Sequence, residues 1–183
     1  MQMKGIILAG GKGSRLYPLT KVSSKQLQAV YDKPMIYYPL TTLIAAGIRE
    51  ICLITTRQDE LMFKNLLNNG SQFGVKLSYI VQDQPLGIAQ AIILSEEFLS
   101  GENYVLILGD NIFSGGSDIP DAINNFKNGA MVFAYHVPDP ERYAVLEFGK
   151  DLKIESLEEK PNNPKSNYAV PGIYLYDNKS IKI

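Results

Sequence analysis

A short glycine-rich turn is the first part of this sequence whose residue types could do chemistry. Residues 8–16 read LAGGKGSRL, in which two basic side chains accompany three glycines, Gly10, Gly11 and Gly13. Glycine lets the backbone approach a ligand closely and adopt positive φ. Successive backbone N–H groups in such a turn form a concavity that binds anions, and Lys12 and Arg15 can add charge-assisted hydrogen bonds. We therefore expect this turn to bind phosphate.

Two common nucleotide-binding motifs do not match the turn. The pattern GxxxxGK[ST] needs a glycine where this chain has Ile6, and it needs Ser or Thr where the chain has Gly13. The pattern GxGxxG fails because Leu16 stands at the position of its last glycine. A conventional P-loop NTPase and a dinucleotide-binding domain therefore both lose support.

The elements around the turn alternate between apolar runs and helical patterns. Strands are expected at residues 4–9, 51–55, 76–81 and 104–108, and helices at residues 35–47, 59–67 and 87–98. This alternation is typical of parallel strands joined by crossover helices. The strands are continuous apolar runs, as a sheet that is covered on both faces requires. We predict an α/β fold with a Rossmann-like, mixed but mostly parallel sheet flanked by helices.

The pattern changes after residue 129. Strand-like segments at 130–136, 143–148, 154–158 and 172–176 are joined by turns, which indicates mixed or antiparallel strands around the sheet. The sequence shows no internal repeat, low-complexity tract or linker, and 183 residues fit one domain. We expect residues 1–183 to form a single domain.

Composition excludes some classes of partner. Lys and Arg number 18 and Asp and Glu 19, a net charge of −1 that argues against a nucleic-acid-binding protein. Apolar runs are too short for a membrane span, and no signal peptide is evident, so a cytoplasmic protein is expected. The one cysteine, Cys52, lies in an apolar run and is expected to be a small buried hydrophobe. His136 has no evident Ser or Cys partner and is expected to be structural.

Longer motifs continue beyond the turn. The chain reads GGKGSRLYPLT at 10–20, KQL at 25–27 and DKPMIYYPL at 32–40. Together these resemble the sugar-1-phosphate nucleotidylyltransferases, and within them the branch of thymidylyltransferases that act on glucose 1-phosphate. The resemblance implies the fold of the nucleotide-diphospho-sugar transferases. It also implies transfer of a deoxythymidylyl group from dTTP to glucose 1-phosphate, giving dTDP-glucose and pyrophosphate.

The resemblance assigns nucleotide-binding roles. In the family the glycine loop wraps the triphosphate, which corresponds here to Gly10, Gly11 and Gly13. Arg15 would stabilise the charge of the reacting phosphates, and Lys25 would lie near them. Gln26 would contact the pyrimidine base. The segment QDQPLGIAQA at 82–91 resembles the base-recognition element, in which Gln82 reads the base edge and Gly87 allows close backbone contact.

A metal site is expected at Asp110. This carboxylate follows the apolar run 104–108 within LGDNIF, which resembles the family's metal motif. Ligands in α/β folds bind at the carboxyl ends of parallel strands, and Mg²⁺ is held by one or two carboxylates together with substrate phosphates. The resemblance implies Mg²⁺ as cofactor. A second metal-ligating aspartate of the family would come from a region after the equivalent of Ile183.

Two further segments resemble the sugar side of the family's site. They are ERYAV at 141–145 and LEEKP at 157–161. Glu158 would hydrogen-bond sugar hydroxyls, and Lys160 would hold the sugar phosphate. The family more often has Gly where this chain has Ala144, which adds a methyl group near the hexose but keeps the backbone N–H.

The mechanism that follows is in-line attack of the hexose 1-phosphate on the α-phosphorus of the nucleotide. The nucleophile is already an anion, so no general base is needed, and positioning and electrostatics carry the catalysis. Repulsion between the two anionic substrates would be offset by Mg²⁺ on Asp110 together with Arg15, Lys25 and Lys160.

Two alternatives remain open at the level of sequence. One is a uridylyltransferase of the same family that uses UTP. The other is a non-catalytic module that binds a nucleotide or sugar nucleotide, because the chain stops at Ile183 directly after a predicted strand and the possible opening of a helix. We expect the chain to lack the C-terminal part of the domain. Full-length members of the family are expected to be homo-oligomers.

Overall fold

The computed structural model describes residues 3–11, 13–84, 86–114, 118–151 and 153–182. The chain forms two compact units. Unit 1 comprises Met1–Ala130 and Leu175–Ile183, and unit 2 comprises Met131–Tyr174. The single domain expected over residues 1–183 stays a prediction, because compactness alone does not decide whether the two units fold together.

A mostly parallel sheet has most of its residues in unit 1, and two of its strands extend past the unit boundary at residues 131–132 and 173–174. Its strand order is β5-β4-β1-β6-β12-β7, with β1 at Lys4–Ala9, β4 at Glu50–Thr55, β5 at Lys76–Val81, β6 at Tyr104–Leu108, β7 at Ala130–Val132 and β12 at Ile173–Tyr176. β1 lies between β4 and β6 and pairs in parallel with both, so that Ile7 aligns with Leu53 and Ile107. β4 pairs in parallel with β5. The α/β fold with a mostly parallel sheet, expected from the alternating pattern, is confirmed.

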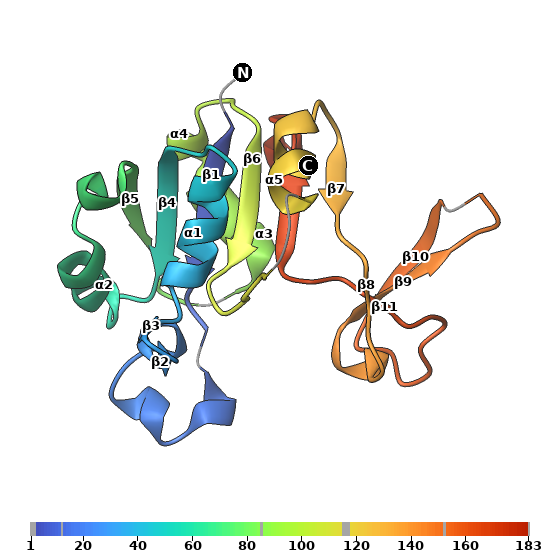
Figure 1. Cartoon of the computed structure of the whole chain (residues 1–183), viewed down its shortest axis with the longest axis horizontal. Helices are drawn as coiled ribbons and strands as arrows, with labels where there is room; N and C mark the ends of the chain where they lie inside the picture. Colours follow the sequence, from blue (N-terminus) through green and yellow to red (C-terminus); the bar gives the residue numbers. More distant parts are fainter. Residues whose placement is uncertain (1–2, 12, 85, 115–117, 152, 183) are drawn as a thin grey trace. The chain divides into compact units, whose positions relative to one another are not determined.

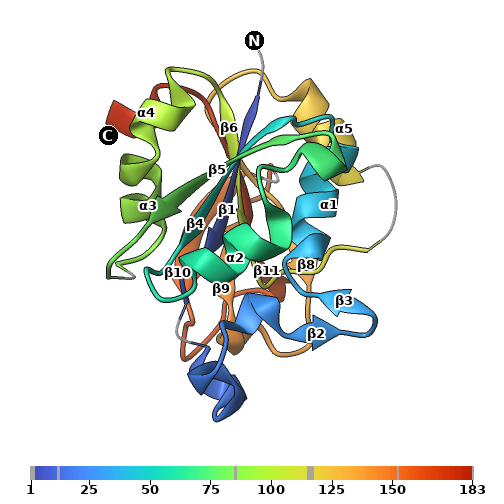
Figure 2. The ribbon, with the colours of Figure 1, turned by 90° about the vertical axis from the view of Figure 1, so that its left-hand side faces the viewer.

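Helices cover both faces of this sheet. They are α1 at Tyr37–Ala45, α2 at Glu60–Leu67, α3 at Ile88–Leu94, α4 at Glu96–Leu99 and α5 at Asp118–Asn125. α1 and α5 lie on one face, and α3 and α4 lie on the other (Figures 1 and 2). The central strands are therefore buried almost throughout, as their continuous apolar sequences indicated. Among the described residues, no helix combines the length and the hydropathy needed to cross a membrane.

Two expected elements are divided in the structure. The helix expected at 87–98 is interrupted at Ser95, which is buried and donates its hydroxyl to the Ala91 carbonyl at 2.8 Å. Such bonding back to the residue four positions earlier competes with a regular helix and bends it. The strand expected at 130–136 is divided between β7 in the large sheet and β8 at Tyr135–His136 in unit 2.

Unit 2 carries a four-stranded antiparallel sheet in the order β10-β9-β11-β8, with β9 at Ala144–Phe148, β10 at Ile154–Glu159 and β11 at Tyr168–Ala169. β9 and β10 form its longest pair. His136 packs edge-on against Tyr168, with 5.7 Å between the ring centroids. The antiparallel character expected for the second half of the sequence is confirmed here.

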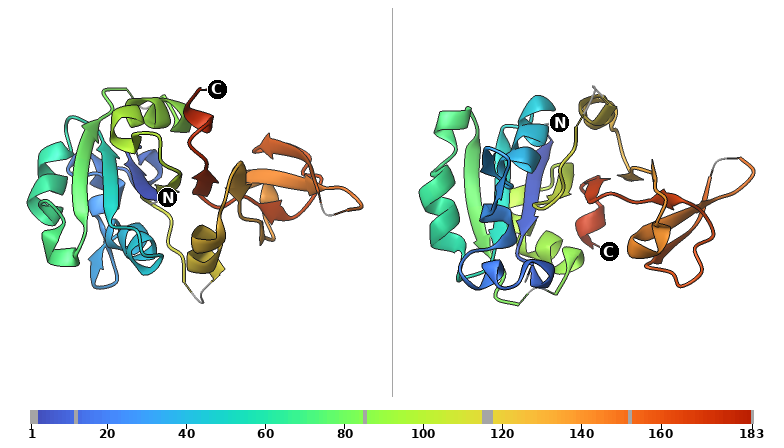
Figure 3. Two further views of the ribbon diagram at one scale, coloured as in Figure 1. Left: turned by 90° about the horizontal axis from the view of Figure 1, so that it is seen from above. Right: turned by 60° about the horizontal axis from the view of Figure 1, so that its bottom comes forward.

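The segment after β12 returns to unit 1 (Figure 3). The Asn178 backbone N–H donates to Asn103 Oδ1 at 3.1 Å, and its side-chain amide donates to the Gly101 carbonyl at 2.8 Å. The hydroxyls of Tyr104 and Ser180 lie 2.7 Å apart. These hydrogen bonds hold residues 178–180 at the amino end of β6.

We expect Cys52 to resist alkylation in the folded protein. Cys52 is fully buried in β4, and desolvation raises the pKa of its thiol to about 12, partly opposed by a hydrogen bond with Ser95. The thiolate, which is the reactive form, is thus scarce at pH 8.5. Iodoacetamide labelling followed by mass spectrometry should find no adduct in the time that denatured protein needs for complete labelling. The thiol ionises at a lower pH in the unfolded chain than in the folded one. The free energy of unfolding therefore decreases as the pH rises above about 9. Equal labelling of native and denatured protein would contradict the assignment.

Candidate active site

The carboxyl ends of β1 and β6 meet closely at one edge of the sheet in unit 1. The Gly109 N–H, just after β6, donates to the Leu8 carbonyl of β1 at 2.8 Å. A Cβ at Gly109 would lie 3.1 Å from that carbonyl oxygen and 3.1 Å from Gln26 Cγ, so a side chain here would crowd both neighbours. The arrangement brings Asp110 beside the glycine-rich turn that follows β1, at the edge where α/β folds bind ligands.

The turn itself has one position that only glycine fills easily. Gly13 has a φ of +56° and directly precedes a 3₁₀ helix at Ser14–Leu16. A Cβ there would lie 2.7 Å from Thr20 Cγ2 and 3.2 Å from Lys25 Cβ. Arg15 lies on the 3₁₀ helix with an exposed side chain. Lys12, expected to assist in phosphate binding, lies outside the described residues.

Two of the expected catalytic residues form an ion pair. Lys25 begins a 3₁₀ helix at Lys25–Leu27, and its Nζ donates to Asp110 Oδ2 at 2.8 Å. The Asn111 side-chain amide donates to Asp110 Oδ1 at 3.2 Å. The side chains of Lys25 and Asp110 keep 31% and 34% of their surface exposed, so both can reach a ligand from solvent.

Gln26, the residue next to Lys25, is buried with an unsatisfied polar atom. Only 4% of it is exposed, and its backbone carbonyl accepts the Ile36 N–H at 2.9 Å. Its side-chain Oε1 has no hydrogen-bond partner among the described residues. A buried acceptor without a donor costs about 1–3 kcal/mol, and a donor that reached this oxygen would relieve that cost. Its Cγ borders Gly109, which places it under the same edge of the sheet.

Gln82 connects β5 to the glycine-rich turn. It is 2% exposed, and its N–H continues the ladder by donating to the Thr55 carbonyl at 2.8 Å. Its side-chain Nε2 donates to Gln90 Oε1 at 2.6 Å and to the Gly87 carbonyl at 3.4 Å. Its Oε1 lies on the side of Gly10, where a Cβ would come within 3.1 Å of it. Gly87 precedes α3 with a φ of +96°, which favours glycine.

The structure therefore brings most of the expected nucleotide-site residues of unit 1 together: Gly10, Gly13, Lys25, Gln26, Gln82, Gly87 and Asp110. Arg15 and Gly11 belong to the same turn, and Gly11 has open space around its Cα. Sequence reasoning assigned no role to Gln90, although this residue accepts a hydrogen bond from Gln82. The sequence signal for it was weak, because a glutamine in a helix is usually a solvated residue.

The expected sugar-site residues lie in unit 2, on the β9–β10 pair. Ala144 pairs with Glu159, and Val145 pairs with Glu158. Because paired residues share a face and neighbours alternate, the Ala144 methyl and the Glu158 carboxylate lie on opposite faces of this ladder. Lys160 follows β10 with a φ of +46°, donates its N–H to the Tyr143 carbonyl at 2.9 Å and keeps an exposed side chain. The roles expected for these residues stay predictions.

The residues present fit a metal ion that is shared with a substrate, not one held in a protein cage. Within the described ranges, no cluster of three or more His, Cys, Asp or Glu side chains could hold a metal. Asp110 offers one partly exposed carboxylate. Mg²⁺ is commonly held by one or two carboxylates and substrate phosphates, so this donor set suits Mg²⁺ only in company with a nucleotide.

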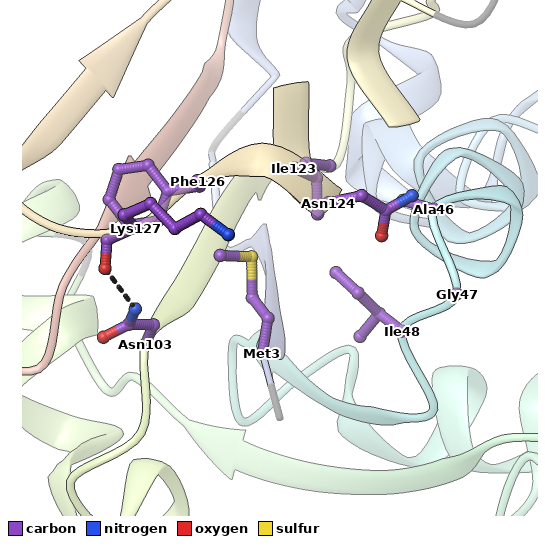
Figure 4. Close-up of a pocket in the computed structure, with 9 residues that line it drawn as sticks. All are labelled: Met3, Ala46, Gly47, Ile48, Asn103, Ile123, Asn124, Phe126 and Lys127. Atoms are coloured by element: carbon purple, nitrogen blue, oxygen red, sulfur yellow. Dashed lines mark hydrogen bonds between the residues drawn. The ribbon is translucent and has the colours of Figure 1, made fainter. Parts of the chain in front are cut away.

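A separate cavity of about 430 Å³ opens at the opposite edge of the sheet (Figure 4). It lies at the amino ends of β1 and β6 and is lined by Met3, Ala46, Gly47, Ile48, Asn103, Ile123, Asn124, Phe126 and Lys127. The Asn103 side chain donates to the Lys127 carbonyl at 3.2 Å beside it. None of the expected site residues lines this cavity, so it is distinct from the edge at the glycine-rich turn.

Comparison with known proteins gives a consistent assignment. Residues 4–183 match the family model described as nucleotidyl transferase. The chain is 54% identical over 183 residues to the glucose-1-phosphate thymidylyltransferase of Neisseria meningitidis, covering 98% of this chain and 63% of that relative. It is also 54% identical to the Mycobacterium tuberculosis protein of the same name, covering 99% of this chain and 63% of that relative. The chain thus spans 63% of the length of these curated relatives.

Solved structures agree with the fold. A Bacillus anthracis structure that carries the same enzyme name superposes with a TM-score of 0.93 at 48% identity, covering 98% of this chain and 73% of that one. A UDP-glucose pyrophosphorylase structure superposes with a TM-score of 0.84 at 23% identity, which supports the fold alone. The family match extends over almost the whole chain, and the chain therefore belongs to the nucleotidyl transferase family.

Proposed function

We propose that this chain forms the nucleotide-binding portion of a glucose-1-phosphate thymidylyltransferase. The proposed reaction transfers a deoxythymidylyl group from dTTP to glucose 1-phosphate and releases pyrophosphate. The observation that carries the proposal is the Lys25–Asp110 pair beside the glycine-rich turn, where a cation and a possible metal ligand meet an anion-binding loop. The relatives at 54% identity that bear this enzyme name support the substrates.

The chemistry needs little from the protein beyond charge and alignment. An oxygen of glucose 1-phosphate attacks the α-phosphorus of dTTP, a new P–O bond forms, and the bond to pyrophosphate breaks with its electron pair on the leaving oxygen. The nucleophile carries its negative charge beforehand, so no proton has to be removed. Arg15 and Lys25 supply positive charge at the nucleotide, and Lys160 is assigned the sugar phosphate on the resemblance alone.

Asp110 is the residue that would hold Mg²⁺, which when bound would offset phosphate charge. In the present arrangement Lys25 neutralises this carboxylate. Lys25 therefore has two possible anionic partners, Asp110 and the phosphates of a bound nucleotide. We propose that it exchanges the first for the second when the nucleotide binds, which leaves the carboxylate available to the metal. This exchange needs no change in the fold, because both side chains are partly exposed.

A second candidate function is nucleotide binding without turnover. The observation that favours it is that the glycine-rich turn and the Lys25–Asp110 pair would bind a nucleotide whether or not transfer follows. The proposed compartment, the cytoplasm, fits a reaction between soluble phosphorylated substrates.

Pyrophosphate release from dTTP and glucose 1-phosphate tests the proposal. We expect release that requires both substrates and Mg²⁺, and that is faster with dTTP than with UTP at equal concentrations. Faster release with UTP would favour the uridylyltransferase. No release, with dTTP still bound in calorimetry, would favour the binding module. Absence of both release and binding would refute the site assignment for this chain.

A further inference from the structure

We propose that Gln90 is a positioning residue that fixes the amide orientation of Gln82 and thereby selects a thymine or uracil base over cytosine. The inference rests on the proposed function, because it takes Gln82 to contact the base of the nucleotide. Gln90 hydrogen-bonds to Gln82 at 2.6 Å, so it would act on the base through its neighbour. Its contacts establish which end of the Gln82 amide is left for a ligand.

A backbone N–H determines which side chain donates in the hydrogen bond between Gln82 and Gln90. Gln90 Oε1 lies 3.2 Å from the Leu86 N–H, which also donates to the Gln84 carbonyl at 2.9 Å. A backbone N–H can only donate, so the Gln90 atom facing it must be the amide oxygen. The Gln82 atom 2.6 Å from that oxygen must then be a donor, which is Nε2.

A second backbone group enforces the same orientation. Gln82 Nε2 also lies 3.4 Å from the Gly87 carbonyl, which can only accept. With the amide reversed, Gln82 Oε1 would face two acceptor oxygens and lose both hydrogen bonds. Gln82 is 2% exposed, so water cannot readily replace those bonds. The Leu86 N–H, acting through Gln90, and the Gly87 carbonyl, acting directly, therefore fix the same orientation of the Gln82 amide.

The orientation leaves Gln82 Oε1 on the side of Gly10 as a hydrogen-bond acceptor. Thymine and uracil carry an N3–H flanked by two carbonyl oxygens, so this N–H can donate to such an acceptor. Cytosine has an unprotonated acceptor at N3 and a donor only at its exocyclic amino group. An oxygen at this place thus attracts the N3 position of thymine or uracil and repels that of cytosine. Without Gln90 the amide keeps only the longer of its two orienting hydrogen bonds, the one to the Gly87 carbonyl, and this distinction weakens.

The test compares dissociation constants for dTTP and dCTP in the unaltered chain and in two variants. Gln90→Leu removes the acceptor, and we expect the preference for dTTP over dCTP to fall by about 10-fold or more. In Gln90→Glu a carboxylate oxygen still accepts from Gln82 Nε2 and Leu86 N–H, and the preference should stay within about 3-fold. The exposed Gln84→Leu, in the same segment, serves as a control that keeps the preference.

The ratio of the dCTP and dTTP dissociation constants distinguishes a change in the Gln82 amide orientation from a general loss of order in the site. A general loss of order would weaken the binding of both nucleotides alike. Equal weakening of dTTP and dCTP by Gln90→Leu, or loss of preference in Gln90→Glu, would overturn the inference while the proposed function stands. Failure of the unaltered chain to bind dTTP would instead refute the proposed function and, with it, the inference.

A probe on the unaltered chain covers the case in which a variant does not fold. The triphosphate of N3-methylthymidine lacks the N3–H, and we expect it to bind at least about 10-fold more weakly than dTTP. Binding as tight as that of dTTP would overturn the assignment of Gln82 Oε1 as the acceptor.

Discussion

Replacement of Asp110 by asparagine is expected to lower the rate of pyrophosphate release by at least about 100-fold, with the fold unchanged. Asparagine has the same shape, and its oxygen can still accept from Lys25 Nζ, which now lies 2.8 Å from the carboxylate. Only the negative charge is lost. A metal ligand that loses its charge forfeits several kcal/mol of charge stabilisation, and about 3 kcal/mol corresponds to about 100-fold in rate. A stopped assay for pyrophosphate at several Mg²⁺ concentrations measures this rate.

The same substitution should separate catalysis from binding. In EDTA, Asp110→Asn should bind dTTP as well as or better than the unaltered chain, because one negative charge near the phosphates is gone. Glu60→Gln is the matched control, since Glu60 on α2 forms a comparable pair with Lys64 at 2.7 Å outside the site. It should leave both release and binding unchanged. Release by Asp110→Asn at the unaltered rate would refute the metal assignment, and loss of metal-free binding would show a structural role instead.

Much of the fold and the edge of the site could be predicted from the sequence. The apolar runs bounded by glycine or polar residues gave β1, β5 and β6 with the bounds that the structure shows. Since β1 and β6 are adjacent and parallel, the residues that follow them share one edge, which places Asp110 beside Gly10. The pattern of apolar residues identifies the buried strands. Because these strands pair in parallel, the polar residues that follow them lie at the same edge of the sheet.

Other features depend on contacts between distant segments, which patterning does not encode. The Lys25–Asp110 pair spans 85 residues, and the orientation of the Gln82 amide depends on Gln90 and on two backbone groups. α5 was not predicted because Ile123 is its one buried residue, although its acidic first turn is favourable for a helix. The short hairpin of β2 (Ala29–Val30) and β3 (Lys33–Pro34) offers too few residues for an alternating pattern.

Gly13→Ala is expected to weaken nucleotide binding strongly, because the glycine-rich turn is closely packed against its neighbours. Two costs coincide at this position. The left-handed backbone at a φ of +56° costs an alanine about 1–2 kcal/mol. The added methyl would also lie 2.7 Å from Thr20 Cγ2 and 3.2 Å from Lys25 Cβ, an overpacking worth about 1–3 kcal/mol. Thr20 is β-branched and stiff, so the turn rather than the side chain has to move.

A turn at the surface can relax without unfolding the protein, so the cost should appear in nucleotide affinity. If the relaxed turn is favoured by about 3 kcal/mol, the binding-competent turn is about 1% populated and the dissociation constant for dTTP rises about 100-fold. Gly74→Ala is the matched control, because Gly74 also has a positive φ, +70°, but its Cβ would meet nothing within 4 Å. That variant should lose a few degrees of Tm and no affinity.

A double variant isolates the steric part of this effect. Thr20→Ser removes Cγ2, the atom that a Cβ at residue 13 would approach most closely, and keeps the hydroxyl. In a double-mutant cycle measured by dTTP calorimetry, Thr20→Ser should restore about 10-fold of the affinity lost by Gly13→Ala, while changing little by itself. The backbone strain remains, so recovery should be partial. Strictly additive losses would mean that the methyl does not meet Thr20, and that the turn is held by the conformation of Gly13 alone.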